Sequence, residues 1–190
     1  SFRAFKAVRG ETVGLIDFDA HPDTRDDRTN GPTSGTPFRQ LLEGGHLDGN
    51  NAVQIGFHGF LGSSELYEYD VNHGITLIPA AEVRRRRMAD VMKQALEKAS
   101  DGTDSIYISL DIDVMDSPWG PGTGGDAAGG LDSHEMLEAM YLLGRHPKVK
   151  VFDLVEIDPI KDVRAVTSKL AVNIMMSFLT GFYERKQINA

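Results

Sequence analysis

The pattern of apolar and polar positions predicts strands and helices that alternate along the chain. Short apolar runs bounded by Gly, Asp or Pro indicate strands, and longer segments with helix-forming residues indicate helices. The expected strands cover residues 12–18, 52–57, 75–78, 106–110 and 149–156. The expected helices cover residues 38–43, 63–73, 80–99, 132–143 and 163–186, and residues 1–10 form the basic end of a further helix. Asp132 and Glu135 have the spacing of a capping box.

Strands that are apolar almost throughout are typical of parallel sheets, which are buried on both faces. Their alternation with helices therefore predicts an α/β fold with a mostly parallel sheet. We find no internal repeat and no convincing linker, so we expect residues 1–190 to form a single domain. Functional sites in such sheets lie at the carboxyl ends of the strands.

Ligand-type side chains follow two of these strands at alternate positions. The run at residues 106–110 leads into Asp111 and Asp113, and the run at residues 13–18 leads into a second set, Asp19, His21 and Asp23. Side chains two residues apart on a strand project to the same side, and two neighbouring carboxylates repel each other unless a cation lies between them. A single Asp in such a place is most often a turn or a cap. Five such residues at two strand ends instead predict a metal site, with room for two ions.

Composition narrows the chemistry of this site. The chain has no Cys, so thiolate ligands and disulfides are excluded, and carboxylates with some imidazole favour Mn²⁺ over Mg²⁺ or Zn²⁺. The formal net charge of −8 argues against a nucleic-acid surface. The near-apolar run at residues 170–182 is too short to span a bilayer, and no signal peptide is visible. We expect a cytoplasmic protein that binds neither nucleic acid nor membranes.

Three motifs in this order resemble the arginase/agmatinase superfamily, the ureohydrolases. They are DAHPD at residues 19–23, SLDIDVMD with PGTGG at residues 109–125, and LVEIDP at residues 154–159. The resemblance implies a three-layer α/β/α fold, a centre of two Mn²⁺ ions per subunit, and a homo-oligomer. It implies the metal ligands Asp19, His21, Asp23, Asp111 and Asp113.

The same resemblance implies that Glu156 holds the amidine or guanidine group of a small substrate, and that Asp23 also orients the attacking hydroxide. A carboxylate at a third strand end can itself accept two parallel N–H bonds from a planar cation. The family's first metal ligand, a His in a GGDHS-like motif, has no counterpart in these residues. The chain opens on Ser1 and reaches a strand almost at once, so we expect that ligand in a preceding segment.

The loop TSGTPFRQ at residues 33–40 points to one branch of the superfamily. Ser34 stands where members acting on guanidines usually carry a catalytic His. The SGTPF form, with Arg25 upstream, resembles formimidoylglutamases, which hydrolyse N-formimidoyl-glutamate to glutamate and formamide. The two carboxylates of a glutamate-derived substrate need cationic partners, and Arg25 and Arg39 are the candidates. Ser34 and Glu156 are the other expected substrate contacts.

Two alternatives stay open. One is a guanidine hydrolase of the agmatinase, guanidinobutyrase or arginase kind that releases urea, which an assay with both substrate types would distinguish. The other is a non-catalytic relative that acts as an interaction subunit, which absence of the upstream His ligand would favour.

Overall fold

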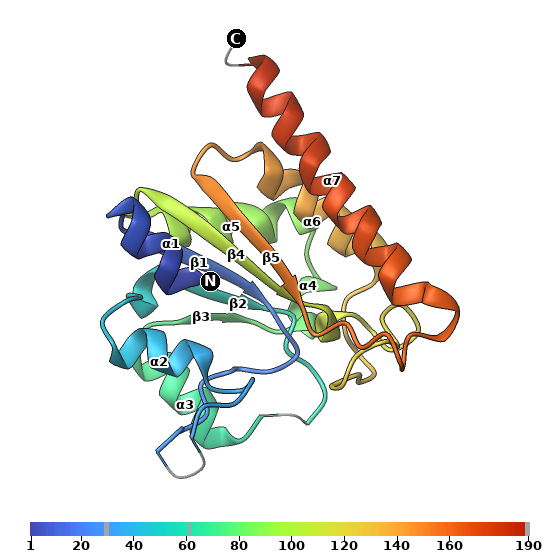
Figure 1. Cartoon of the computed structure of the whole chain (residues 1–190), viewed down its shortest axis with the longest axis horizontal. Coiled ribbons are helices and arrows are strands. Elements are labelled where there is room, and N and C mark those ends of the chain that lie inside the picture. Colours follow the sequence, from blue (N-terminus) through green and yellow to red (C-terminus); the bar gives the residue numbers. More distant parts are fainter. Residues whose placement is uncertain (29–30, 61, 189–190) are drawn as a thin grey trace.

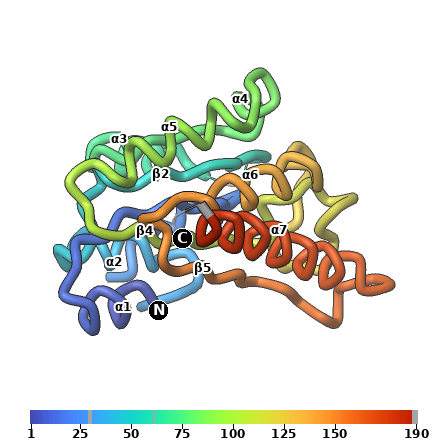
Figure 2. The backbone as a smooth tube through the Cα atoms, turned by 90° about the horizontal axis from the view of Figure 1, so that it is seen from above, coloured from blue at the N-terminus to red at the C-terminus, as the bar shows by residue number. Residues whose placement is uncertain are grey.

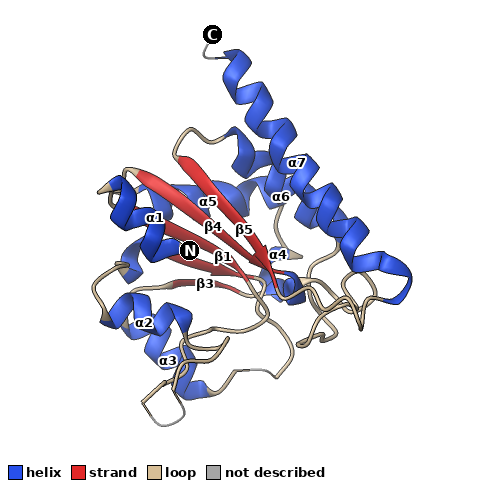
Figure 3. Cartoon of the chain, in the orientation of Figure 1, coloured by secondary structure: helices blue, strands red, loops and turns tan. Residues whose placement is uncertain are grey.

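The computed structural model describes residues 1–28, 31–60 and 62–188. Five parallel strands form one sheet in the order β3-β2-β1-β4-β5, so β1 lies at its centre (Figure 3). The strands are β1 (Val13–Phe18), β2 (Ala52–Ile55), β3 (Thr76–Ile78), β4 (Ser105–Asp111) and β5 (Val149–Val155). The central pair, β1 and β4, is joined along all six residues of β1.

Helices cover both faces of this sheet. They are α1 (Phe2–Arg9), α2 (Pro37–Glu43), α3 (Ser64–Asn72), α4 (Ala80–Val83), α5 (Met88–Ser100), α6 (Ser133–Arg145) and α7 (Val166–Ile188). Helices α1 and α2 lie on one side of the sheet, and α5, α6 and α7 lie on the other (Figures 1 and 2). The predicted three-layer α/β/α architecture with a parallel sheet is confirmed.

Alternate residues of the strands feed two separate hydrophobic cores. Ile16, Phe18 and Ile108 are fully buried beneath α5 and α6. Leu15 and Tyr107 face the opposite side, in a smaller core that α1 and α2 complete. Burial of each such side chain contributes about 1.5–3 kcal/mol. The sheet is therefore held rigidly from both faces, and its strand ends are fixed in position.

The structure corrects one predicted helix. Residues 80–99 form two helices, α4 and α5, because the backbone of Arg87 is extended and serves as the N-cap of α5. Arg84, in the same break, reaches across to the carbonyl of Gly130 and lies 3.7 Å from Asp116. The capping box of Asp132 and Glu135 at the start of α6 is present as predicted.

Helix α7, Val166–Ile188, lies close to the predicted range of residues 163–186. Residues 163–187 are long and apolar enough, by length and composition alone, to cross a membrane, although the apolar run at residues 170–182 is too short; the core helix of a soluble protein can have the same property. In the structure α7 packs along α6, and two glycines bring the helices into backbone contact. A Cβ atom at Gly181 would lie 2.1 Å from the carbonyl oxygen of Tyr141, and one at Gly144 would lie 2.2 Å from that of Phe178.

We predict that Gly181→Ala lowers the free energy of unfolding by about 1–3 kcal/mol, the usual cost of overpacking. This loss outweighs the gain of about 1 kcal/mol in helix propensity, because the obstructing atom is backbone and cannot rotate away. Urea unfolding would measure it, with Asn173→Ala at an exposed position of α7 as the control. A more stable Gly181→Ala variant would contradict the close contact.

Candidate metal centre

A cavity of about 570 Å³ lies where β1, β4 and β5 end. Most of the side chains predicted to bind metal or substrate line it, namely Asp19, His21, Asp23, Arg25, Ser34, Asp111, Asp113 and Glu156. The cavity continues along the face of the sheet that α1 and α2 cover, past Phe2 and Phe38. The carboxyl ends of three strands thus contribute to one site, as a parallel sheet requires.

The aspartates enter the cavity from the ends of β1 and β4 and from the segments that directly follow these strands. Strand β4 ends at Asp111, and Asp113 lies in the 3-10 turn that follows, Ile112–Val114. The Asp111 carboxylate caps this turn by accepting the N–H of Asp113 at 2.9 Å. Strand β1 likewise ends at Phe18, before the first ligand-type residue. Residues two apart therefore face the same cavity as predicted, although most of them lie just beyond the strand ends and not within the strands.

His21 lies between two carboxylates. Its Nδ1 is 2.9 Å from Oδ2 of Asp113 and 3.3 Å from Oδ1 of Asp19. One ligand atom from each of the three residues lies within 4.8 Å of the others. Backbone N–H groups fix both carboxylates, because Ala20 donates to Asp113 at 3.1 Å and His21 donates to Asp19 at 2.6 Å. The chain itself thus holds this group of ligand atoms in place.

Burial and mutual repulsion make the ionised carboxylates costly. Burial raises the pKa of Asp111 to about 9, with repulsion from Asp19 and Asp113 adding to it. Burial likewise raises the pKa of Asp23 to about 8 and that of Asp19 to about 7. Burial would raise the pKa of Asp113 too, but hydrogen bonds from His21 and Ala20 bring it below its usual value.

These properties fit a divalent cation. Hydrogen bonds to Asp113 and Asp19 raise the pKa of His21 to about 10, so without metal a proton on Nδ1 lies between the two carboxylates. A metal ion coordinated by Nδ1 and both carboxylates would replace that proton and relieve the repulsion. Carboxylates and an imidazole without thiolates are a suitable donor set for Mn²⁺.

The backbone at the cavity shows one close approach and two unusual conformations. Gly125 approaches so closely that a Cβ atom there would lie 2.4 Å from Oδ2 of Asp113. Asp23 and Glu156 have positive φ angles of 53° and 64°, which residues other than Gly rarely adopt. Such strain is typical of functional sites, where the surrounding structure imposes a side-chain position.

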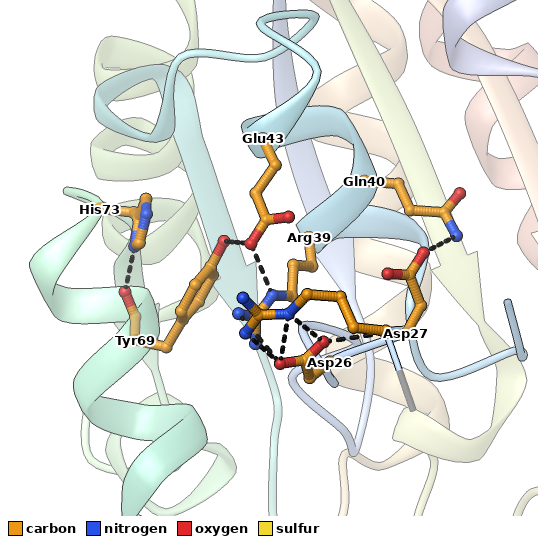
Figure 4. A network of polar contacts seen from close by, with 8 residues as sticks. Asp26, Asp27, Arg39, Gln40, Glu43, Tyr69 and His73 are labelled. Atoms are coloured by element: carbon orange, nitrogen blue, oxygen red, sulfur yellow. Dashed lines mark hydrogen bonds and ion pairs between the residues drawn. The ribbon is translucent and has the colours of Figure 1, made fainter. Parts of the chain in front are cut away.

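Arg25 and Ser34 lie at the cavity as predicted, but Arg39 does not. Among the described residues, the cavity lining includes Arg25, Ser34 and Gly35, and the side chain of Arg25 packs against Gly35. The guanidinium of Arg39 instead lies 4.4 Å from the ring centre of Tyr69, and its Nε donates to Glu43 at 2.8 Å (Figure 4). Arg39 ties α2 to α3, and its side chain is only 14% exposed. We therefore do not assign it to the substrate.

Sequence reasoning missed a row of polar residues beneath the cavity. Asp17 on β1 is in register with Gln54 on β2 and Ser109 on β4, and Ser109 is in register with Asp153 on β5. Asp17 is 1% exposed, and neither of its oxygens has a hydrogen-bond partner among the described residues. The sequence did carry a signal, since Asp17 interrupts an otherwise apolar strand.

Fold and site together define an α/β protein with a candidate metal site of carboxylates and imidazole at the strand ends. The chain belongs to the arginase family, whose model matches residues 1–181. It is 38% identical to a formimidoylglutamase of Halalkalibacterium halodurans over 181 residues, 95% of this chain and 56% of the relative. It is also 34% identical to a mitochondrial agmatinase of Gallus gallus, across 88% of this chain and 48% of the relative.

Solved structures agree with this assignment. The formimidoylglutamase of Bacillus subtilis superposes with a TM-score of 0.91 at 34% identity, covering 95% of this chain and 56% of that one. A Trypanosoma cruzi formiminoglutamase with Mn²⁺ superposes with a TM-score of 0.88 at 29% identity, covering 95% and 60%. The predicted resemblance to this family is confirmed. The chain spans a little over half the length of the formimidoylglutamases that it matches.

We predict that the metal-free protein loses stability as pH rises from 5 to 9. Asp19, Asp23 and Asp111 have folded-state pKa values of about 7, 8 and 9, above their ordinary value, so folding becomes costlier as they ionise. Loss of the proton of His21, with a pKa of about 10, acts in the same direction. Urea unfolding of chelator-treated protein at several pH values would test this, and Asp111→Asn should flatten the profile. A flat profile in the unmodified protein would contradict the pKa assignments.

We also predict that Asp111→Ala combined with Asp113→Ala abolishes stoichiometric metal binding, because it removes both carboxylates contributed by the β4 end. Elemental analysis after dialysis against Mn²⁺ would measure it. Asp101→Ala, at an exposed position before β4, is the matched control. Unchanged metal content in the double variant would refute the site.

Proposed function

We propose that this chain carries the active site of a hydrolase that cleaves a C–N bond of a linear amidine, N-formimidoyl-L-glutamate, giving L-glutamate and formamide. The observation that carries the proposal is one cavity that joins the Asp19, His21 and Asp113 group to Glu156 and Arg25. Formimidoylglutamases among the relatives, at 34–38% identity, support the choice of substrate.

Two Mn²⁺ ions would be held by Asp19, His21, Asp23, Asp111 and Asp113. When bound, they supply an activated water at neutral pH and a Lewis acid for the amidine. The solved structure of a Trypanosoma cruzi formiminoglutamase with Mn²⁺ supports this metal.

The chain's own residues bind and orient the reactants. Glu156, at the end of β5, accepts two N–H bonds from the planar amidinium and so presents its carbon to the water. Asp23 accepts a hydrogen bond from that water. This bond orients a lone pair of the water oxygen toward the amidinium carbon. The positive φ angle of Asp23 aims the side chain into the cavity, where Asp19 and His21 also lie.

Arg25 and Ser34 select a glutamate-derived substrate. The guanidinium of Arg25 offers paired N–H groups to a carboxylate of the glutamate portion. Ser34 is small and neutral, in a loop held to Arg25 by the backbone hydrogen bond from Arg25 N–H to the carbonyl of Gly35 at 2.9 Å. A homo-oligomer and a cytoplasmic location stay predictions.

A guanidine hydrolase is the second candidate, because a guanidinobutyrase of Pseudomonas aeruginosa is 32% identical to this chain. The deciding experiment offers Mn²⁺-loaded protein N-formimidoyl-L-glutamate, agmatine and 4-guanidinobutyrate, and measures formamide and urea. Formamide from the first substrate, with little urea from the others, is the expected outcome. Efficient urea release with little formamide would replace this proposal by the second candidate.

We predict that Glu156→Gln lowers kcat/KM for formimidoylglutamate about 100-fold or more. Two hydrogen bonds to a charged carboxylate are lost or weakened, and each contributes about 1.5–3 kcal/mol. Metal content should stay unchanged, which separates substrate binding from metal binding. The exposed Glu97→Gln in α5 is the control, and equal losses in both variants would argue against a role for Glu156.

A further inference from the structure

A second cavity of about 220 Å³ lies behind the loop that carries the metal ligands. We call it the rear cavity and define it by Ala20, Pro22, Gln54, His58, Asp70 and Leu77, all of which line it. It is enclosed by the end of β2, by α3 and by the loop after β1.

The loop after β1 separates this cavity from the metal centre. Its odd-numbered residues Asp19, His21 and Asp23 line the front cavity, whereas Ala20 and Pro22 line the rear one. The two cavities therefore share a wall one residue thick. The proposed function does not use the rear side of this wall.

Two polar side chains in the rear cavity, Asp70 and Gln54, carry acceptor atoms without partners among the described residues. Asp70 on α3 is 1% exposed, and neither of its carboxylate oxygens accepts a hydrogen bond from the described residues. Gln54 is also buried. Its Nε2 donates to the carbonyl of Pro22, and its Oε1 has no partner among the described residues. The hydroxyl of Thr24, buried beside Asp70, acts as a side-chain donor that lowers the pKa of this carboxyl, although no hydrogen bond of ordinary length and angle joins the two.

His58 adds a third acceptor. Its Nδ1 lies 2.8 Å from the carbonyl oxygen of Gly56, which accepts only if Nδ1 carries the proton. The buried Nε2 then has a free lone pair and no partner among the described residues. Buried acceptors without donors cost free energy, so this set calls for a ligand that donates hydrogen bonds.

The charge and shape of the rear cavity narrow the class of ligand that it can bind. Burial raises the pKa of Asp70 to about 6, so the carboxylate is ionised at pH 7.5 and favours a cation. Ala20, Pro22, Phe57 and Leu77 supply apolar wall that a hydrated ion would not contact favourably. The rear cavity has room for several water molecules, which is too wide for a bare metal ion that needs ligand atoms within about 2–2.6 Å.

We propose that the rear cavity is an accessory binding site for a small organic cation, an alkylammonium or amidinium, held by Asp70, Gln54 and His58. Its apolar body lies against Pro22 and Leu77, and its N–H groups donate to the three acceptors. A bound cation supports the loop after β1 from behind.

The test is calorimetric titration of Mn²⁺-loaded protein carrying Glu156→Gln, which weakens amidine binding in the front cavity. The probes are acetamidinium and n-propylammonium, with n-propanol and potassium chloride as neutral and inorganic comparisons. We expect at least one organic cation to bind about tenfold or more tightly than n-propanol, and Asp70→Asn to remove that difference. Glu68→Gln, at an exposed position of the same helix, should bind like the parent.

Equal binding of n-propanol, or binding that Asp70→Asn leaves unchanged, would overturn the proposal and leave the cavity to water. Saturable potassium binding that Asp70→Asn abolishes would overturn it in favour of an inorganic cation. His58→Phe removes a second acceptor from the same cavity. It replaces Asp70→Asn in the titration if that variant does not fold. The measurement needs no turnover, so its outcome is independent of the proposed hydrolase activity.

Discussion

The enclosure of several carboxylates at one edge of a parallel sheet is the constraint on which the rest of this structure depends. Asp19, Asp111 and Asp113 are buried, and their charges cannot coexist there without a cation or protons between them. The sheet, rigid between its two cores, keeps them from moving apart. A metal ion bound there would relieve the repulsion that the fold imposes.

Much of this arrangement could be read from the sequence. The apolar runs located all five strands, and the capping box located the start of α6. The grouping of Asp19, His21 and Asp113 followed from parallel topology, because the carboxyl ends of β1 and β4 must meet at one edge. The expected alternation also continues past the strand ends, since Asp19 and His21 line one cavity and Ala20 lines the other.

Other features depended on contacts between segments far apart in the sequence. Arg39 looked like a substrate ligand because it lies in the active-site loop, yet Tyr69, thirty residues later, holds it over α3 (Figure 4). The break between α4 and α5 lies where Arg84 reaches to Gly130, a contact that no helix propensity encodes. The positive φ angles of Asp23 and Glu156 likewise arise from tertiary structure, because local preference opposes them.

The wall between the two cavities also limits how this protein could be engineered. Its residues alternate between the front and rear cavities, so a substitution at Ala20 or Pro22 made to reshape the rear space would displace His21 as well. The backbone N–H of Ala20 already holds Asp113 at 3.1 Å. Redesign of the rear cavity would therefore have to start from Asp70 or Leu77, on elements that carry no metal ligand.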